Sequence, residues 1–189
     1  MPVHNYIIIK KIIDFIFAVI LLIFLLLPLL LILILIISVD RINPIFSQER
    51  SGYKKKDFKL LKLKTFKNGK ITKLGKFLRK YKIDELPQII NVLKGNISFI
   101  GPRPLLPSYN DFYNKNQNLR FNVMPGITGL SQVKLNNTNN WKQKFTYDIF
   151  YSKNISLKLD MLVLCLTIKV IFEILIGKKI ITESHKPFI

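Results

Sequence analysis

The feature that most constrains this chain is a long stretch without charge near its N-terminus. No charged residue occurs from Phe15 to Val39. As a single α-helix this stretch is about 37 Å long at about 1.5 Å per residue, which is enough to span a bilayer. It is longer than the core of a signal peptide, and no small-residue cleavage pattern follows it. The sequence therefore predicts a membrane segment over residues 1–40 and a separate domain over residues 41–189.

Two topologies fit this membrane segment. A spanning helix is the simpler one, because proline-kinked spanning helices are common. However, Pro28 near the middle removes a helical hydrogen bond and bends the axis. Both flanks are also basic, with Lys10 and Lys11 before the segment and Arg41 after it. Since basic flanks stay cytoplasmic, a re-entrant hairpin broken at Pro28 would keep both ends on that face. The residues alone leave both topologies open.

The segment that follows is strongly basic and ends in two adjacent acids. The chain has a net charge of +19, and residues 50–82 contain 14 Lys and Arg against a single Asp. Asp84 and Glu85 come directly afterwards. Carboxylates that attack phosphorus or bind a metal among many cations suit chemistry on a polyanionic phosphate substrate.

Asp84 and Glu85 precede an expected short helix. Apolar residues at helical spacing over residues 89–93 predict the helix, Gly95 ends it, and Pro87 is tolerated only in its first turn. The exposed N–H groups at a helix N-terminus favour a charged carboxylate. Considered alone, Asp84 is more simply interpreted as a helix N-cap, because Asp is common at that position.

Two cations before the acid pair are candidates to bind phosphate. Residues 58–67 alternate apolar side chains with lysines, of which Lys64 is the best candidate. The simpler interpretation is a half-buried strand with a solvated lysine face. Arg79 belongs to an amphipathic helix expected over Lys70–Lys82, and it either reaches the same anion or is a solvated helix charge.

A third candidate cation follows a short apolar strand expected over residues 97–100. Arg103 lies between Pro102 and Pro104, after Gly101. The two prolines bias the backbone of Arg103 towards an extended conformation, which lowers the entropy cost of placing its guanidinium on a phosphate.

The rest of the domain is expected to mix helices with short strands. We expect a polar helix over Tyr109–Arg120, a tight turn over Pro125–Gly129, a strand over Leu130–Val133 and an amphipathic helix over Trp141–Tyr151. Leu159–Ile176 is apolar but interrupted by charges, which predicts a helix lying against the membrane or packed on the domain. The predicted fold class is α+β and mostly helical, with interfacial amphipathic helices.

The motifs and their order resemble those of one protein family. These motifs are Asp-Glu-Leu-Pro-Gln at 84–88, Gly-Pro-Arg-Pro-Leu at 101–105, Pro-Gly-Ile-Thr-Gly at 125–129, and the segment Trp141–Asn154. Together they are similar to the small monotopic phosphoglycosyl transferases, the bacterial sugar transferases, over nearly the whole chain. That family transfers a sugar phosphate from a nucleotide diphosphate sugar, usually a UDP-sugar, to a membrane polyprenyl phosphate. The products are a polyprenyl-diphosphate sugar and UMP.

The resemblance implies a role for each candidate residue. It makes Asp84 the nucleophile and Glu85 the ligand of magnesium (Mg2+). An aspartyl-phosphosugar intermediate would divide the transfer into two displacements, and Mg2+ would offset the charge that repels a carboxylate from phosphorus. The residues that it assigns to substrate binding are Lys64, Arg79, Pro102, Arg103 and Pro104.

The resemblance also implies a location and partners. It favours the re-entrant topology, in the bacterial inner (cytoplasmic) membrane, with the active site on the cytoplasmic face. The reaction would be the first membrane step of a glycan pathway. The implied partners are a UDP-sugar, polyprenyl phosphate and membrane lipid, and nucleic acid is not expected. Downstream glycosyltransferases and a second copy of the chain are further candidates.

The chain departs from the common family pattern at four places. Leu27 replaces a Ser before Pro28, which removes a hydrogen bond that helps to hold the break. Met124 replaces an Arg before Pro-Gly-Ile-Thr-Gly, which removes a cation near the site that Arg120 would have to supply. Residues 135–137 replace Asn-Gly-Arg, and the segment between Thr65 and Lys76 is shorter than in many relatives. The last three departures concern donor or sugar selection more than the chemistry.

The alternative function is a membrane-anchored basic protein that binds nucleic acid or anionic lipid, or assembles glycan enzymes, without catalysis. The basic segment suits this role electrostatically. The role leaves Asp84, Glu85 and Arg103 unexplained, and the sequence has no recognisable nucleic-acid motif.

Overall fold

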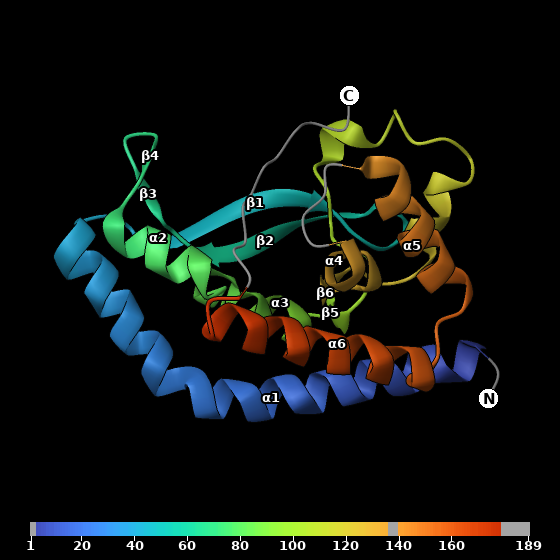
Figure 1. Ribbon diagram of the computed structural model, residues 1–189, viewed down its shortest axis with the longest axis horizontal. Coiled ribbons are helices and arrows are strands. Elements are labelled where there is room, and N and C mark those ends of the chain that lie inside the picture. Colours follow the sequence, from blue (N-terminus) through green and yellow to red (C-terminus); the bar gives the residue numbers. More distant parts are fainter. Residues whose placement is uncertain (1–2, 136–139, 179–189) are drawn as a thin grey trace.

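A computed structural model describes residues 3–135 and 140–178. Its longest element is helix α1 (Val3–Leu35), which a π-helical turn, η1 (Ile36–Asp40), extends. Figure 1 shows α1 along the lower edge of the molecule. The only helix of the described residues that is long and apolar enough to cross a membrane is this one, over Asn5–Asp40.

Helix α1 is bent and continuous. Pro28 lies inside the helix, and the C-terminal limb of α1 turns upwards around the domain (Figure 1). A proline inside a helix removes one backbone hydrogen bond and crowds the preceding turn, which bends the axis. The expected break at Pro28 is therefore wrong in one respect: the chain bends near its middle but stays helical. The re-entrant topology stays a prediction.

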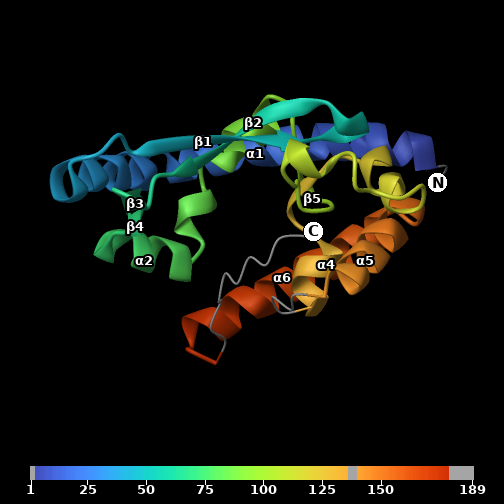
Figure 2. The same cartoon turned by 90° about the horizontal axis from the view of Figure 1, so that it is seen from above.

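Two hairpins follow α1. Strands β1 (Ile45–Ser51) and β2 (Asp57–Leu63) pair antiparallel and lie along α1 (Figure 2). This pairing confirms the strand expected from the alternation of apolar residues and lysines. Strands β3 (Phe66–Lys67) and β4 (Lys70–Ile71) form a second, very short hairpin.

Helix α2 (Lys73–Lys80) is shorter than expected. Thr72 is its N-cap, and the Thr72 hydroxyl accepts a hydrogen bond of 2.9 Å from the Gly75 amide. A cap at residue 72 begins the helix there, so Lys70 belongs to β4 instead.

The centre of the domain contains two short helical elements and a parallel strand pair. The 3₁₀ turn η3 (Ile83–Glu85) leads into α3 (Gln88–Leu93), and β5 (Ser98–Ile100) pairs in parallel with β6 (Gly126–Thr128). The two strands approach so closely that a Cβ at Gly126 would lie 2.1 Å from the Gly101 backbone nitrogen. Only a residue without a side chain fits there.

Two expectations for the following segment are wrong. Residues 109–120 contain no α-helix; the 3₁₀ turns η4 (Pro107–Tyr109) and η5 (Gln117–Asn122) lie there. Asn114 and Gln117 exchange side-chain to backbone hydrogen bonds of 2.9 Å, which offer the backbone an alternative to a helix.

The expected strand over Leu130–Val133 is instead part of helix α4 (Leu130–Leu135). Leu130 and Val133 have the i, i+3 spacing of one helix face and pack on the same core cluster. The neighbouring strand is β6, within the Pro-Gly-Ile-Thr-Gly segment where a turn was expected.

Helices α5 (Trp141–Lys153) and α6 (Leu157–Leu175) complete the described structure, and both were expected. Figures 1 and 2 show that α6 lies close to the N-terminal end of α1 and diverges from it along its length. Most of the exposed large hydrophobic side chains belong to α1 and α6. The mostly helical fold, with a long apolar N-terminal helix and a small domain of short strands, confirms that part of the predicted fold class. The interfacial position of the amphipathic helices stays a prediction.

Helix α1 also contributes to the core of the domain. Figure 2 shows that β1 and β2 lie over it, while α2, α5 and α6 lie to one side. Ala18 is fully buried in a cluster with Leu60 of β2 and Ile89 of α3. A second cluster joins Ile36, at the C-terminal end of the long helix, to Leu63 of β2. Because these contacts run along most of α1, the membrane helix and the domain form one packed unit.

Candidate active site

The two adjacent carboxylates lie in η3, between α2 and α3. Asp84 is 5% exposed and Glu85 is 8% exposed. Pro87 occupies the N-cap position of α3 and makes no side-chain cap. The interpretation of Asp84 as the N-cap of this helix is therefore wrong, because the cap lies three residues later. Burying two neighbouring carboxylates is unfavourable unless cations compensate for them.

Two cations contact Glu85 directly. The Nζ of Lys62 lies 2.8 Å from Glu85 Oε1, and Nη2 of Arg103 lies 3.2 Å from the same oxygen. Burial by itself raises the pKa of Glu85, but the charges of Arg103, Lys62 and Lys82 outweigh it and hold the pKa well below its usual range. Glu85 is therefore an ionised, buried carboxylate within a cluster of positive charge.

Helix α3 positions the strand that carries Lys62 next to the carboxylates. The amide of Asn91 on α3 accepts a hydrogen bond of 2.9 Å from the Leu61 backbone and donates one of 2.8 Å to the Lys59 carbonyl. These bonds fasten β2 to α3, and η3 leads directly into α3. The side chain of Lys62 thus comes to lie beside Glu85.

Lys64 and Arg79, the two cations predicted before the acid pair, contact Phe66 and Thr65. The Nζ of Lys64 lies 5.6 Å from the centre of the Phe66 ring. Arg79 Nε donates a hydrogen bond of 2.7 Å to the Thr65 hydroxyl. Sequence reasoning favoured Lys64 over Lys62, but it is Lys62, inside β2, that reaches the carboxylate. The roles of Lys64 and Arg79 in phosphate binding stay predictions.

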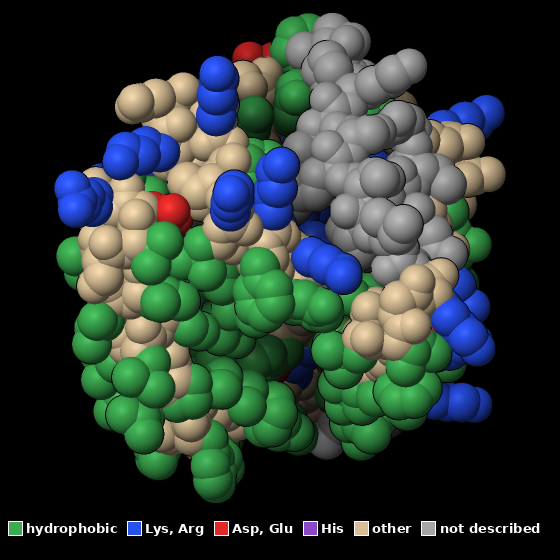
Figure 3. All heavy atoms as spheres, turned by 60° about the vertical axis from the view of Figure 1, so that its left-hand side comes forward, with side chains coloured by type: hydrophobic (Ala, Val, Ile, Leu, Met, Phe, Trp, Pro, Cys, Tyr) green, Lys and Arg blue, Asp and Glu red, His purple; other side chains and the backbone are tan. Residues whose placement is uncertain are grey.

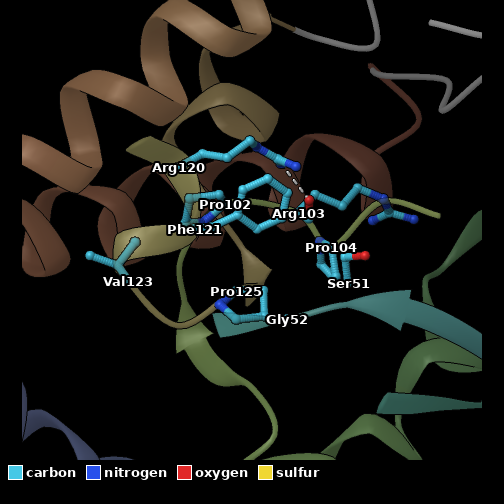
Figure 4. Close-up of a pocket in the computed structure, with 9 residues that line it drawn as sticks. All are labelled: Ser51, Gly52, Pro102, Arg103, Pro104, Arg120, Phe121, Val123 and Pro125. Carbon is cyan, nitrogen blue, oxygen red and sulfur yellow. Dashed lines mark hydrogen bonds between the residues drawn. The ribbon is translucent and has the colours of Figure 1, made fainter. Parts of the chain in front are cut away.

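Arg103 is held in place from behind by Arg120 (Figure 4). The Nη2 of Arg120 donates a hydrogen bond of 2.7 Å to the Arg103 carbonyl oxygen and lies 2.9 Å from Asp148 Oδ2. Arg120 is only 4% exposed. Figure 4 shows the guanidinium of Arg103 pointing away from Arg120. Arg120 therefore supports the loop from inside the protein, and it does not replace the cation absent at Met124.

Sequence reasoning missed Arg50. Its guanidinium donates to Gln48 Oε1 at 2.7 Å and to the Pro104 carbonyl at 3.4 Å. Burial and the neighbouring charge of Arg103 lower the pKa of Arg50 to about 10. The guanidiniums of Arg50 and Arg103 repel each other, so an anion bound between them would be stabilised by both. Pro102 and Pro104 line the small cavity beside this loop, together with Ser51 and Gly52 (Figure 4).

The carboxylates also lie close to the membrane helix. Ile83, the residue before Asp84, packs against the core cluster of Ile36, Leu63 and Leu78. Leu29, Ile32 and Leu33, which follow Pro28 in α1, pack against the same cluster, so η3 and the C-terminal limb of the bent helix share one core. The acid pair is thus near an element that would be embedded in lipid.

Comparison with known proteins identifies the family. The profile of the family described as "Bacterial sugar transferase" matches residues 5–174. This chain belongs to the bacterial sugar transferases. Membership makes it a phosphoglycosyl transferase and does not favour the alternative of a basic binding or assembly protein without catalysis.

Several individual bacterial sugar transferases are similar in sequence. The chain is 40% identical over 152 residues to "Uncharacterized sugar transferase EpsL" of Bacillus subtilis (strain 168), covering 74% of each protein. It is 34% identical over 192 residues to "UDP-N-acetylgalactosamine-undecaprenyl-phosphate N-acetylgalactosaminephosphotransferase" of Aeromonas hydrophila, covering 90% of this chain and 45% of that protein. It is 39% identical over 112 residues to "UDP-glucose:undecaprenyl-phosphate glucose-1-phosphate transferase" of Klebsiella pneumoniae, covering 52% and 23%. The chain therefore spans less than half of the last two relatives.

The donor atoms in this bacterial sugar transferase fit a magnesium ion shared with a substrate. Residues 3–135 and 140–178 contain no group of three or more His, Cys, Asp or Glu that could hold a metal. They do contain the adjacent buried carboxylates of Asp84 and Glu85. Magnesium is usually bound by one or two carboxylates, with substrate phosphates and water as the remaining ligands. The site is therefore suited to a metal that arrives with a diphosphate.

Proposed function

We propose that this chain transfers a sugar 1-phosphate from a UDP-sugar to polyprenyl phosphate, giving a polyprenyl-diphosphate sugar and UMP. The observation that carries the proposal is the buried Asp84–Glu85 pair, which contacts Lys62 and Arg103 and lies beside α1. The names of the Aeromonas and Klebsiella relatives support the substrates, because both combine a UDP-sugar with undecaprenyl phosphate.

In this mechanism Asp84 attacks the phosphorus that carries the sugar. A bond forms between a carboxylate oxygen of Asp84 and that phosphorus, while the bond from phosphorus to the oxygen of UMP breaks and UMP leaves. An oxygen of polyprenyl phosphate then attacks the same phosphorus, and the Asp84 carboxylate is released. Two displacements replace one direct transfer, as in other covalent mechanisms.

The surrounding side chains reduce the charge repulsion that opposes both attacks. Arg103 presents a guanidinium from a backbone supported by Arg120, and Lys62 supplies a second charge. We assign Lys64 and Arg79 to the outer phosphate contacts. Glu85 would hold Mg2+ with the substrate diphosphate, and the ion would supply further positive charge at the phosphorus.

The position of the acceptor requires the site to lie at a membrane surface, which we propose is the cytoplasmic face of the bacterial inner membrane. Both ends of α1 are bonded to the same domain: Lys10 pairs with Asp160, and Asp40 accepts hydrogen bonds from Lys67 and Thr72. These bonds support a re-entrant α1 whose two ends share one face. Figure 3 shows hydrophobic side chains over the lower part of one face and several Lys and Arg above them, which is the pattern of a protein embedded from one side.

The proposal is tested by measuring UMP release from purified protein in detergent with undecaprenyl phosphate and magnesium. A panel of UDP-sugars is supplied one at a time, because the sequence does not name the sugar. We expect release with at least one UDP-sugar, and we expect multiple turnovers only when the lipid phosphate is present. Absence of UMP release with every donor would contradict the proposed function.

A further inference from the structure

A buried polar cluster lies where α1 and α6 converge, away from Asp84 and Glu85. Its centre is Asp160 of α6, which is 5% exposed. Asp160 Oδ2 accepts hydrogen bonds from the Tyr6 hydroxyl at 2.5 Å and from Lys10 Nζ at 2.6 Å, both from α1. The other oxygen, Oδ1, accepts a hydrogen bond of 2.5 Å from the Tyr151 hydroxyl of α5. One carboxylate thus joins three helices.

The buried Lys10–Asp160 ion pair is expected to determine how the helices are arranged and to add little to the free energy of unfolding. Lys10 is 7% exposed, so the Lys10–Asp160 pair is almost completely removed from water. A buried ion pair adds little net stability, but removing one partner is strongly unfavourable because the other charge stays buried. Such a pair therefore enforces one arrangement of the helices over others. The chemistry proposed above uses neither Lys10 nor Asp160.

The same cluster reaches the loop that carries Arg103. The single proton of the Tyr151 hydroxyl is shared between Asp160 Oδ1 and the carbonyl oxygen of Ile100, which accepts at 3.0 Å. Ile100 is the last residue of β5 and is followed by Gly101, Pro102 and Arg103. The prolines restrict the backbone after β5, so a displacement at Ile100 would be transmitted to Arg103.

We propose that Asp160 is a positioning residue that docks the N-terminal limb of α1 on the domain and, through Tyr151, sets the position of Arg103. Asp160 determines where the membrane limb sits by pairing with Lys10. It determines where β5 ends by holding the Tyr151 hydroxyl against Ile100. The link to Arg103 rests on the proposed function, whereas the docking of the limb does not.

Docking is measured as protection of a buried thiol. Val163 is fully buried and packs in one cluster with Tyr6 and Tyr151. Val163→Cys, made with Cys165→Ser to remove the exposed native thiol, reports access of N-ethylmaleimide beneath the limb. The alkylation rate is compared between Lys10→Met and Lys11→Met in this background.

These two lysines form a matched pair. Both belong to the basic flank of the membrane segment, but only Lys10 pairs with Asp160, since Lys11 is exposed. We expect Lys10→Met to accelerate alkylation by about tenfold or more, because it leaves Asp160 buried without its cation. Lys11→Met should change the rate by less than about twofold. Equal rates in the two variants would overturn the proposal.

The double variant Lys10→Met/Asp160→Asn separates a specific pair from general loosening. Neither charge remains buried in this variant, so we expect protection to return towards that of the parent. A rate as high as that of Lys10→Met alone would contradict a coupling between the two residues. Size-exclusion chromatography in detergent identifies any variant that has lost its fold, and Lys10→Met stays informative if Asp160→Asn alone does not fold.

The link to Arg103 is measured with Tyr151→Phe. This variant keeps the ring in the core and leaves the Lys10–Asp160 pair in place, so the thiol introduced by Val163→Cys should stay protected. We expect KM for the UDP-sugar to rise by about threefold to tenfold, the effect of one buried hydrogen bond, with a smaller change in kcat. The control is Tyr147→Phe, one turn earlier on α5, which should leave KM unchanged.

The outcomes separate the two parts of the inference. Unchanged KM in Tyr151→Phe would overturn the link to Arg103. If the parent protein released no UMP from any UDP-sugar, the proposed function would fail. The alkylation rates of the lysine variants would still decide whether Asp160 docks the limb.

Discussion

Glu85 is the side chain at which the charges of the site converge. Lys62 and Arg103 both contact its Oε1, and they keep its pKa below that of an unfolded chain. A depressed pKa contributes stability above the unfolded pKa, near 4.3, and this stability is lost only as pH falls through the folded pKa. Glu85 therefore stays ionised throughout the physiological range.

The first prediction concerns Asp84. Asp84→Asn keeps the size of the side chain, so we expect the free energy of unfolding to change by no more than about 2 kcal/mol. An amide is a far poorer nucleophile than a carboxylate, so turnover should fall by roughly a thousandfold or more. Intact-protein mass spectrometry after incubation with a UDP-sugar, without lipid acceptor, should show a sugar-phosphate adduct on the parent and none on Asp84→Asn. An adduct mapped to another residue would refute the assignment.

The second prediction concerns Glu85. Glu85→Gln removes a hard oxygen ligand of the type that magnesium prefers, so turnover should fall by roughly a hundredfold and its dependence on magnesium concentration should weaken. Initial rates measured across a magnesium titration check both effects. Parent activity that persists in excess EDTA would remove the metal from the mechanism.

The third prediction compares two lysines near the C-terminal end of β2, Lys62 inside the strand and Lys64 just after it. Lys62 contacts Glu85, whereas the Nζ of Lys64 lies over Phe66. Lys62→Met should lower kcat/KM by about tenfold or more, because it removes a buried partner of an ionised carboxylate. Lys64→Met removes the same charge from the same region and should have the smaller effect. A larger loss in Lys64→Met would make Lys64 the more important phosphate contact, as its sequence pattern predicts.

At the scale of elements, the bend in α1 has a clear consequence for topology. The C-terminal limb shares one core with Ile83 beside the acid pair, and the N-terminal limb packs against β5, where Phe17 and Phe99 make an edge-on ring contact at 5.0 Å. Contacts from both limbs to one domain support the proposed re-entrant topology, in which both ends of α1 stay on the same face of the membrane.

The fourth prediction tests this arrangement. Asn5 and Ser47 are exposed on either side of the membrane segment. In spheroplasts of a strain that expresses the Cys165→Ser protein, Asn5→Cys and Ser47→Cys should both resist a membrane-impermeant maleimide until the membrane is permeabilised. Labelling of Asn5→Cys alone before permeabilisation would establish a spanning helix instead.

The elements also show which parts of the fold a sequence can predict. The alternation over residues 58–67 correctly predicted β2, and the spacing over residues 89–93 correctly predicted α3, because these patterns are local. Residues 130–133 are predicted as a strand, but four residues are too few for either period to be recognised. Their helical form depends on the core that Leu130 and Val133 share, which is tertiary information.

At the scale of the whole molecule, the sequence does not predict the contacts between residues that are far apart in the chain. Asn91 brings Lys62 to Glu85 by bonding to a strand 30 residues earlier. Arg120 supports Arg103 through its backbone carbonyl, which has no sequence signature. The acid pair and the Arg103 loop could be identified because their motifs are contiguous. The contacts that position them could not, because they depend on how distant segments meet.

The separation of Lys10 and Asp160 has a further consequence during protein synthesis. The two residues are 150 positions apart, and ribosomes add about 5–20 residues per second. The ion pair therefore cannot form until roughly 8–30 s after Lys10 has been made. During that interval the apolar helix is already emerging, and only its own hydrophobicity and flanking charges guide its insertion. The final position of the N-terminal limb is thus set late, when the helix that carries Asp160 leaves the ribosome.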